Sequence, residues 1–158
     1  MIRVEVSNRQ TSLDVNTSVL RRVVQDVLRS EGVEIADVSV AIVSDQEIHE
    51  LNCRYLDHDY PTDVLSFVLD RNESNLEGEV IVSTETAIAR CGEFGWSAAE
   101  ELTLYAIHGT LHLVGYLDKT PEDVAQMRER ETFHLRQHGM KRPASTPPHS
   151  CSQGDVEK

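Results

Sequence analysis

The sequence is organised around residues 97–118, which read SAAEELTLYAIHGTLHLVGYLD. Apolar residues recur in this stretch at the spacing of a helix that packs against a core. Ser97 followed by Glu100 is typical of a capping box, which marks the beginning of a helix. Gly115 offers the left-handed backbone conformation at which helices often end. We therefore predict a helix from Ala98 to about Gly115, followed directly by a turn.

Two histidines of this helix and one carboxylate beyond it form a candidate metal site. His108 and His112 are four residues apart, which places their Cβ atoms about 6 Å apart on one helix face. Two imidazoles so placed can share one metal ion at about 2.0–2.1 Å each. The turn after Gly115 can bring Asp118 to the same point. Three protein ligands with a fourth position open are typical of a catalytic metal site.

The alternative for His108 and His112 is a structural histidine pair, because this spacing also arises by chance. The chain contains a second such pair, His134 and His138. We interpret that second pair as ordinary surface histidines near the negative end of a helix dipole. The first pair differs in its apolar surroundings and in the glycine turn and carboxylate that follow it.

The remaining pattern predicts a single α+β domain with one mixed four-stranded sheet. Alternating apolar residues indicate strands near residues 2–6, 38–42, 64–69 and 79–83. Capping residues and apolar periodicity predict about five helices, which begin after Asn16 or Thr17, Ser44, Ser83, Ser97 and Thr120. We expect the domain to cover residues 1–140. Residues 141–158 are rich in Pro, Ser and charge, and we expect a disordered tail there.

Composition limits the compartment and the partners. The chain has 158 residues with 27 acidic and 15 basic side chains, a net charge of −12. This acidity disfavours tight, unaided binding to phosphate backbones. No apolar run approaches the ~20 residues of a membrane span, and the first residues form a strand pattern rather than a signal peptide. Three scattered cysteines give no disulfide framework, so we expect a cytoplasmic protein.

Four blocks of sequence resemble the YbeY family of bacterial endoribonucleases. Residues 108–116, HGTLHLVGY, are similar to the family signature His-Gly-x-Leu-His-Leu-x-Gly-Tyr-Asp-His. Residues 51–67 and 78–83 match two further blocks, and Met127 with Glu131 matches the family's Met-x-x-x-Glu. The resemblance runs from about Val38 to Leu135.

This resemblance implies a fold with a metalloprotease-like core and an activity. The activity is single-strand-specific, metal-dependent endoribonuclease cleavage in ribosomal RNA maturation, at the 3′ end of 16S RNA, and in ribosome quality control. The implied cofactor is one zinc ion per chain on His108, His112 and Asp118, with a metal-bound water as nucleophile or general base. The implied partners are single-stranded RNA and the small ribosomal subunit or its proteins, with neither DNA nor a membrane.

Two departures from the family pattern affect the site. The third ligand is usually His in the family, whereas an ungapped match places Asp118 there. A carboxylate makes the site harder, so manganese and nickel remain alternatives to zinc. The family commonly has Arg after the residue that matches Tyr55, whereas this chain has Leu56. Arg54 or His58 would then have to supply the phosphate contact, or the contact is lost.

Other residues of the matched blocks are candidates beside the metal. Asp63 is a candidate catalytic residue, and Thr62 and Ser66 are candidate substrate-binding residues; the alternative is that they order a loop and a strand. Glu131 is a candidate partner of a ligand histidine, with a solvated helix face as its alternative.

Two other functions remain open from the sequence. The first is a metal-dependent peptide or amide hydrolase. Gly109 speaks against it, because His-Glu-x-x-His proteases place their general base directly after the first histidine. The second is a ribosome-associated assembly factor with a structural metal, for which the acidity would suit basic ribosomal proteins.

Overall fold

The computed structural model describes residues 1–56, 62–72, 75–141 and 152–153. The helices and strands are, in chain order, β1 (Ile2–Asn8), α1 (Thr17–Ser30), β2 (Ile35–Val43), α2 (Asp45–Leu56), β3 (Val64–Arg71), β4 (Asn75–Ser83), α3 (Thr84–Phe94), α4 (Ala98–Leu113), α5 (Pro121–Gln137) and β5 (Ser152–Gln153). The α+β class, the four strands and the five helices predicted from the sequence are confirmed. β2 and β4 begin a few residues earlier than predicted.

The strands form one mixed sheet in the order β1-β2-β4-β3-β5. β1, β2 and β4 are parallel, and β3 is antiparallel to β4. The two residues of β5 pair with Leu65 and Ser66 at the outer edge of β3. The sequence did not predict β5. The other residues of the predicted tail from 142 onward lie outside the described residues.

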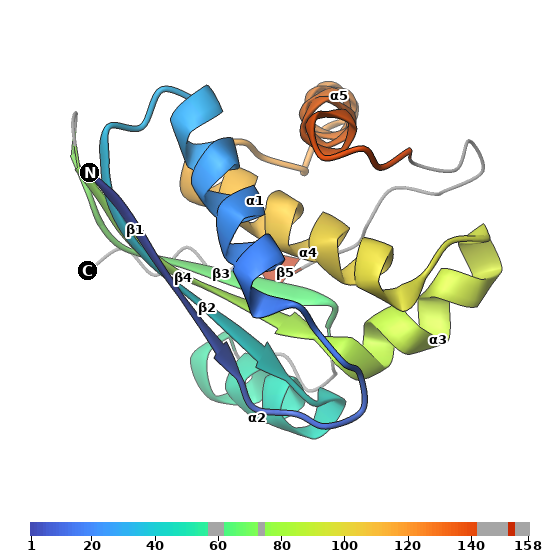
Figure 1. The fold of residues 1–158 in the computed structure, drawn as a ribbon. Helices are drawn as coiled ribbons and strands as arrows, with labels where there is room; N and C mark the ends of the chain where they lie inside the picture. The colour runs from blue at the N-terminus through green and yellow to red at the C-terminus, as the bar shows by residue number, and fades with distance from the viewer. Residues whose placement is uncertain (57–61, 73–74, 142–151, 154–158) are drawn as a thin grey trace.

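The helices cover the two faces of the sheet unequally. α1, α4 and α5 lie on one side of the sheet and α2 on the other (Figure 1). The main core lies between the sheet and the first group of helices, and it includes Val38 of β2, Val80 of β4, and Leu102 and Ala106 of α4. Burial of these side chains is the main favourable term that fixes α4 against the sheet.

The helix ends are fixed by the residues that the sequence indicated. Asn16 accepts a hydrogen bond from the backbone of Val19 at the start of α1. Ser97 and Thr120 form complete capping boxes before α4 and α5. Gly115 has a φ of 109°, as predicted for the residue that ends α4. None of the described helices is both long and apolar enough to cross a membrane.

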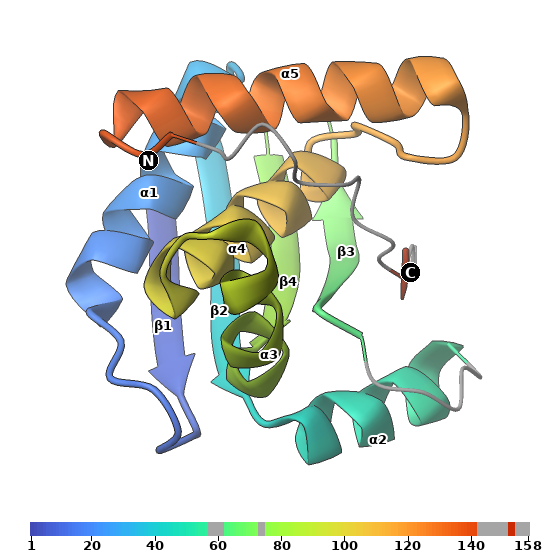
Figure 2. The ribbon, with the colours of Figure 1, turned by 90° about the vertical axis from the view of Figure 1, so that its right-hand side faces the viewer.

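α4 is the central helix of the molecule. Every residue from Glu101 to Leu113 is buried, which is expected of a helix enclosed on all sides rather than amphipathic. The sheet lies beneath α4, and α5 crosses over the end of α4 that carries the histidines (Figure 2). The two histidines are therefore enclosed between the sheet and α5.

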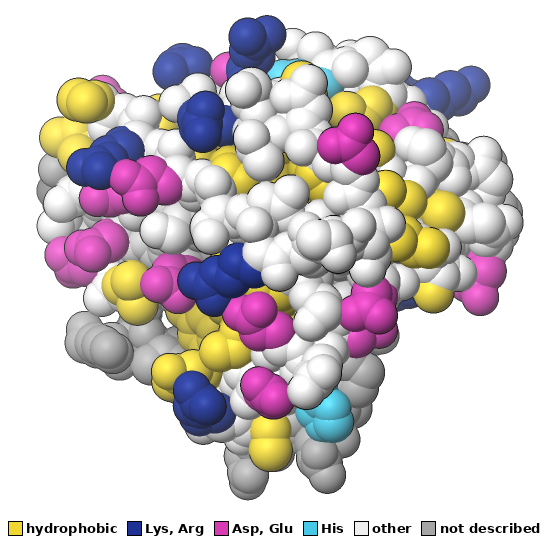
Figure 3. All heavy atoms as spheres, turned by 60° about the horizontal axis from the view of Figure 1, so that its bottom comes forward, with side chains coloured by type: hydrophobic (Ala, Val, Ile, Leu, Met, Phe, Trp, Pro, Cys, Tyr) yellow, Lys and Arg dark blue, Asp and Glu magenta, His cyan; other side chains and the backbone are white. Residues whose placement is uncertain are grey.

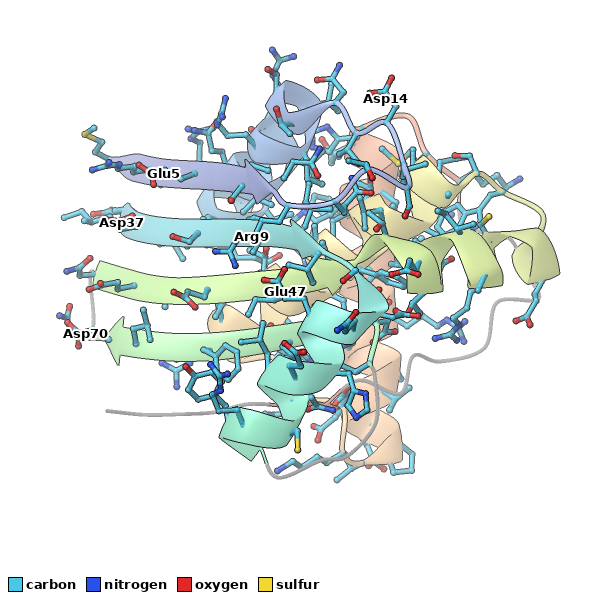
Figure 4. The ribbon with its side chains drawn as sticks, turned by 90° about the horizontal axis from the view of Figure 1, so that it is seen from below. Glu5, Arg9, Asp14, Asp37, Glu47 and Asp70 are labelled. Atoms are coloured by element: carbon cyan, nitrogen blue, oxygen red, sulfur yellow. The ribbon has the colours of Figure 1, made fainter. Side chains whose placement is uncertain are left out.

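The opposite face of the sheet is only partly covered by α2. A groove of about 660 Å³ runs beside α2 and is lined by Leu51, Tyr55, Phe67 and Ile81, among others. Hydrophobic side chains are visible between charged ones on this face (Figure 3). Arg9 crosses to α2 and pairs with Glu47 at 2.7 Å (Figure 4). This groove is on the other side of the sheet from the histidines.

Candidate metal centre

The two histidines of α4 lie close together and are shielded from solvent. His108 and His112 are 2% and 6% exposed. Their Nε2 atoms are 2.9 Å apart. The helical spacing of four residues therefore brings one nitrogen of each ring to a common point, as the sequence predicted.

The turn after α4 brings a carboxylate to the same point. The backbone N–H of Gly115 donates to the carbonyl of His112 at 3.1 Å, and that of Tyr116 donates to Leu111 at 3.0 Å. These bonds fold the chain back across the end of the helix. Oδ2 of Asp118 then lies 3.5 Å from Nε2 of His108 and 3.4 Å from Nε2 of His112.

The other nitrogen of each ring has a partner that orients the imidazole. Nδ1 of His112 donates to the backbone carbonyl of Tyr116 at 2.8 Å. Nδ1 of His108 contacts the carboxylate of Glu131 on α5, which is 2% exposed. Neither the carbonyl nor an ionised carboxylate can donate, so these contacts favour the proton on Nδ1 of each ring. In the neutral imidazole with that tautomer, Nε2 carries no hydrogen and presents a lone pair.

The three converging atoms suit a cation. With both rings neutral, the two nitrogens and the carboxylate oxygen are all acceptors, and a cation at their centre would satisfy all three. Separations of 2.9, 3.4 and 3.5 Å leave a point about 2 Å from all three atoms, which is the length of zinc bonds to His and carboxylate. Among the described residues, this trio is the group of His, Cys, Asp or Glu side chains close enough to hold one ion. The donor set therefore fits a three-ligand metal site.

A second layer of contacts centres on Glu31, which caps the end of α1. Its carboxylate accepts hydrogen bonds from the Tyr116 hydroxyl at 2.7 Å, from Arg130 at 2.6 and 3.0 Å, and from His134 at 2.6 Å. Burial alone would raise the pKa of Glu31, but these hydrogen bonds and the charge of Arg130 outweigh it, and the pKa is lowered. Glu31 is therefore held as an anion.

The prediction that His134 is a surface histidine is wrong. His134 is 2% exposed and bonds to Glu31. Its position near the end of α5 gave no sign of this, because the carboxylate that holds it lies 103 residues away in the sequence. His138 is partly exposed and lies 3.4 Å from Asp26.

Gly109, between the two histidines, faces the sheet. A Cβ on Gly109 would lie 2.6 Å from Cγ1 of Val80 and 2.9 Å from Cγ2 of Val64. The hydroxyl of Ser66 donates to the Gly109 carbonyl at 2.8 Å. A glutamate at this position would collide with the sheet, so the absence of a protease-type general base has a packing cause. Ser66, a predicted substrate contact, joins β3 to α4.

Asp63 and Thr62 lie at the start of β3 and are both buried. One carboxylate oxygen of Asp63 lies 3.4 Å from Arg90 of α3. The hydroxyl of Thr62 donates to the other oxygen at 3.4 Å. Burial raises the pKa of Tyr105, and the negative charges of Glu101 and Asp63 add to the shift. Asp63 therefore belongs to a cluster of charged and polar groups near the beginning of α4.

Neither of the two residues predicted to contact phosphate, Arg54 and His58, is placed beside the histidines by the described structure. Arg54 is on α2, across the sheet from the histidines, with its guanidinium 6.0 Å from the ring of Tyr55. It borders a second groove together with Arg9 and Glu50. His58 lies outside the described residues.

Comparison with known proteins identifies the family of the chain. The family model described as "Endoribonuclease YbeY" matches residues 5–139. The chain belongs to the YbeY family. Proteins named endoribonuclease YbeY from Salinibacter ruber and Moorella thermoacetica are 38% and 39% identical to it, over 82% and 87% of this chain and 88% and 97% of theirs. One from Rhodopirellula baltica is 42% identical over 79% of this chain and 66% of its own length.

A solved structure is also similar. The solution structure of TM1509 from Thermotoga maritima superposes with a TM-score of 0.57 at 25% identity, covering 88% of this chain and 92% of that one. The likeness extends over nearly the whole YbeY domain, and so supports the arrangement of sheet and helices described above.

Proposed function

We propose that this YbeY-family chain is a metal-dependent endoribonuclease of ribosomal RNA maturation, which cuts single-stranded RNA at the 3′ end of 16S RNA and serves ribosome quality control. The observation that carries the proposal is the convergence of His108, His112 and Asp118 in a chain matched by the endoribonuclease family over residues 5–139. We propose zinc as the ion, with manganese and nickel as the alternatives that a carboxylate ligand leaves open.

The protein's own groups would orient the side chains that bind the ion and leave one coordination position open. A bound zinc ion lowers the pKa of a water molecule toward 7 and neutralises charge on a phosphoryl oxygen. The chain contributes the rest: Glu131 and the Tyr116 carbonyl contact the two Nδ1 atoms, so that both Nε2 lone pairs would be available to the ion. Asp118 would add one negative charge as the third ligand, and a fourth position would stay open to solvent and substrate.

Arg54, His58, Thr62 and Ser66 remain our predicted substrate contacts, and Asp63 our predicted catalytic residue. With a net charge of −12, long-range attraction to RNA is weak. We therefore propose that a basic protein of the small ribosomal subunit brings the enzyme to its RNA in the cytoplasm.

The test is cleavage of a labelled single-stranded RNA and of the matching duplex by purified protein. The wild type should cut the single strand, and His112→Ala should lose most of this activity, because it removes one of the three proposed ligands of the ion that would activate the water. His138→Ala is the matched control, because His138 lies partly exposed outside the site, and it should retain activity.

Other results would favour the other functions. Equal cleavage by His112→Ala and the wild type would contradict a role of the metal in catalysis. Chelator-sensitive cleavage of casein without RNA cleavage would favour a peptide hydrolase. Rescue of ribosomal RNA processing in cells by His112→Ala would favour an assembly factor.

A further inference from the structure

Glu31 connects the three segments around the metal centre. It lies directly after α1, and its side chain is 8% exposed. Its partners come from the turn after α4, through Tyr116, and from α5, through Arg130 and His134. The carboxylate is thus the common acceptor for two segments that lie 85 to 103 residues away in the sequence.

The first of these segments sets the ring of His112. The Tyr116 hydroxyl donates to Oε1 of Glu31 at 2.7 Å, while the carbonyl of the same residue accepts from Nδ1 of His112 at 2.8 Å. Tyr116 is anchored at its side chain and bonds to the ligand histidine through its backbone. The hydroxyl bond to Glu31 adds to the bond from the Tyr116 N–H to Leu111, and together they hold the carbonyl that orients the His112 ring.

The second segment sets the ring of His108. Arg130 and His134 both bond to Oε2 of Glu31, and Glu131 lies between them on α5. Residues 130 and 134 share one helix face, so their bonds to a single oxygen hold that face of α5 toward the end of α1, beside the buried Met127 and Leu135. The position of α5 in turn sets where the Glu131 carboxylate lies relative to Nδ1 of His108.

We propose that Glu31 is a positioning residue of the metal centre, whose carboxylate orients both ligand histidines at once, His112 through Tyr116 and His108 through α5. The inference rests on the proposed metal site and is independent of the substrate. Loss of a partner that orients a ligand typically weakens metal binding about 10- to 100-fold. Glu31 supports two such partners, so its substitution should weaken metal binding by a similar factor although Glu31 is not itself a ligand.

The experiment measures zinc affinity of the full chain by competition with a chromophoric chelator, and the visible spectrum of the cobalt(II)-substituted protein. Glu31→Gln keeps the size of the side chain and removes its charge. We expect it to weaken zinc binding about tenfold or more and to change the cobalt(II) spectrum. Glu34→Gln is the matched control, because Glu34 is exposed in the same loop, and it should leave both unchanged.

A purely structural role for Glu31 predicts a different result. Glu31→Gln would then lower the unfolding temperature but bind zinc within twofold of the wild type with an unaltered cobalt(II) spectrum, which would overturn the proposal.

If Glu31→Gln does not fold, Tyr116→Phe is the test variant, because it removes only the hydroxyl that donates to Glu31. Weaker zinc binding by Tyr116→Phe supports the proposal, and wild-type affinity overturns it. His112→Ala separates this inference from the site itself: undiminished zinc affinity in that variant would contradict the metal centre.

Discussion

Glu131 of α5 contacts Nδ1 of His108 of α4, and both residues are 2% exposed. The contact joins the last helix of the domain to the central one at the metal site. It also shows which of the two interpretations of Glu131 holds, because the side chain is enclosed rather than solvated. The rotation of α5 and the orientation of a metal ligand are therefore coupled.

Glu131→Gln should weaken zinc binding about 10- to 100-fold, because the amide orients the His108 ring without the charge that makes the ring more basic. The measurement is a competition titration against a chelator of known affinity. Glu129→Gln, at an exposed position of the same helix, should bind zinc like the wild type. Equal affinities in the two variants would contradict the role given to Glu131.

Gly109→Ala should destabilise the fold by about 1–3 kcal/mol, the usual cost of overpacking. The added methyl would meet Val80 at 2.6 Å and Val64 at 2.9 Å. Urea unfolding followed by circular dichroism measures the loss. Gly92→Ala, in α3 with nothing within 4 Å of the new methyl, should instead stabilise by about 0.5–1 kcal/mol. A neutral Gly109→Ala would show that α4 lies farther from the sheet.

Unfolding stability should fall as the pH drops below about 6.5, in part because of His134. Burial lowers the pKa of His134 below its ordinary 6.5, with Arg130 and His138 adding to the shift and Glu31 opposing it. The unfolded chain therefore takes up this proton at a higher pH than the folded chain, and protonation favours unfolding. His134→Gln should reduce the slope of stability against pH between about pH 7 and pH 5. An unchanged slope would contradict the buried, neutral His134.

Asp63→Asn should lower the free energy of unfolding by about 1–3 kcal/mol, because it removes a charged acceptor from a buried network. Zinc affinity should stay at the wild-type value, since Asp63 pairs with Arg90 at 3.4 Å and is outside the ligand trio. Chemical denaturation and the zinc competition assay on the same variant give both numbers. A loss of RNA cleavage without a loss of stability would support instead the catalytic role predicted from the sequence.

Much of the fold could be predicted because its signals are local. The capping boxes at Ser97 and Thr120 and the left-handed Gly115 act within a few residues, and all three occur as predicted. One helix and one turn also bring His108, His112 and Asp118 together, while their role as metal ligands stays a prediction.

The parts that the sequence did not yield depend on distant contacts. Glu31 lies at the end of the first helix, and nothing in its neighbourhood indicates that Tyr116, Arg130 and His134 bond to it. The prediction that His134 lies on the surface is wrong for the same reason. The sequence does not indicate the orienting role of Tyr116, because its backbone carbonyl, which any residue could supply, makes the contact to His112. Only the family's Met-x-x-x-Glu pattern gave a signal for Glu131.

The most direct test is a zinc anomalous difference map from crystals of the full chain grown with zinc. The account predicts one strong peak per chain, about 2 Å from Nε2 of His108, Nε2 of His112 and a carboxylate oxygen of Asp118, with a fourth ligand from solvent. A peak elsewhere, or one on the two histidines with Asp118 turned away from it, would contradict the three-ligand centre.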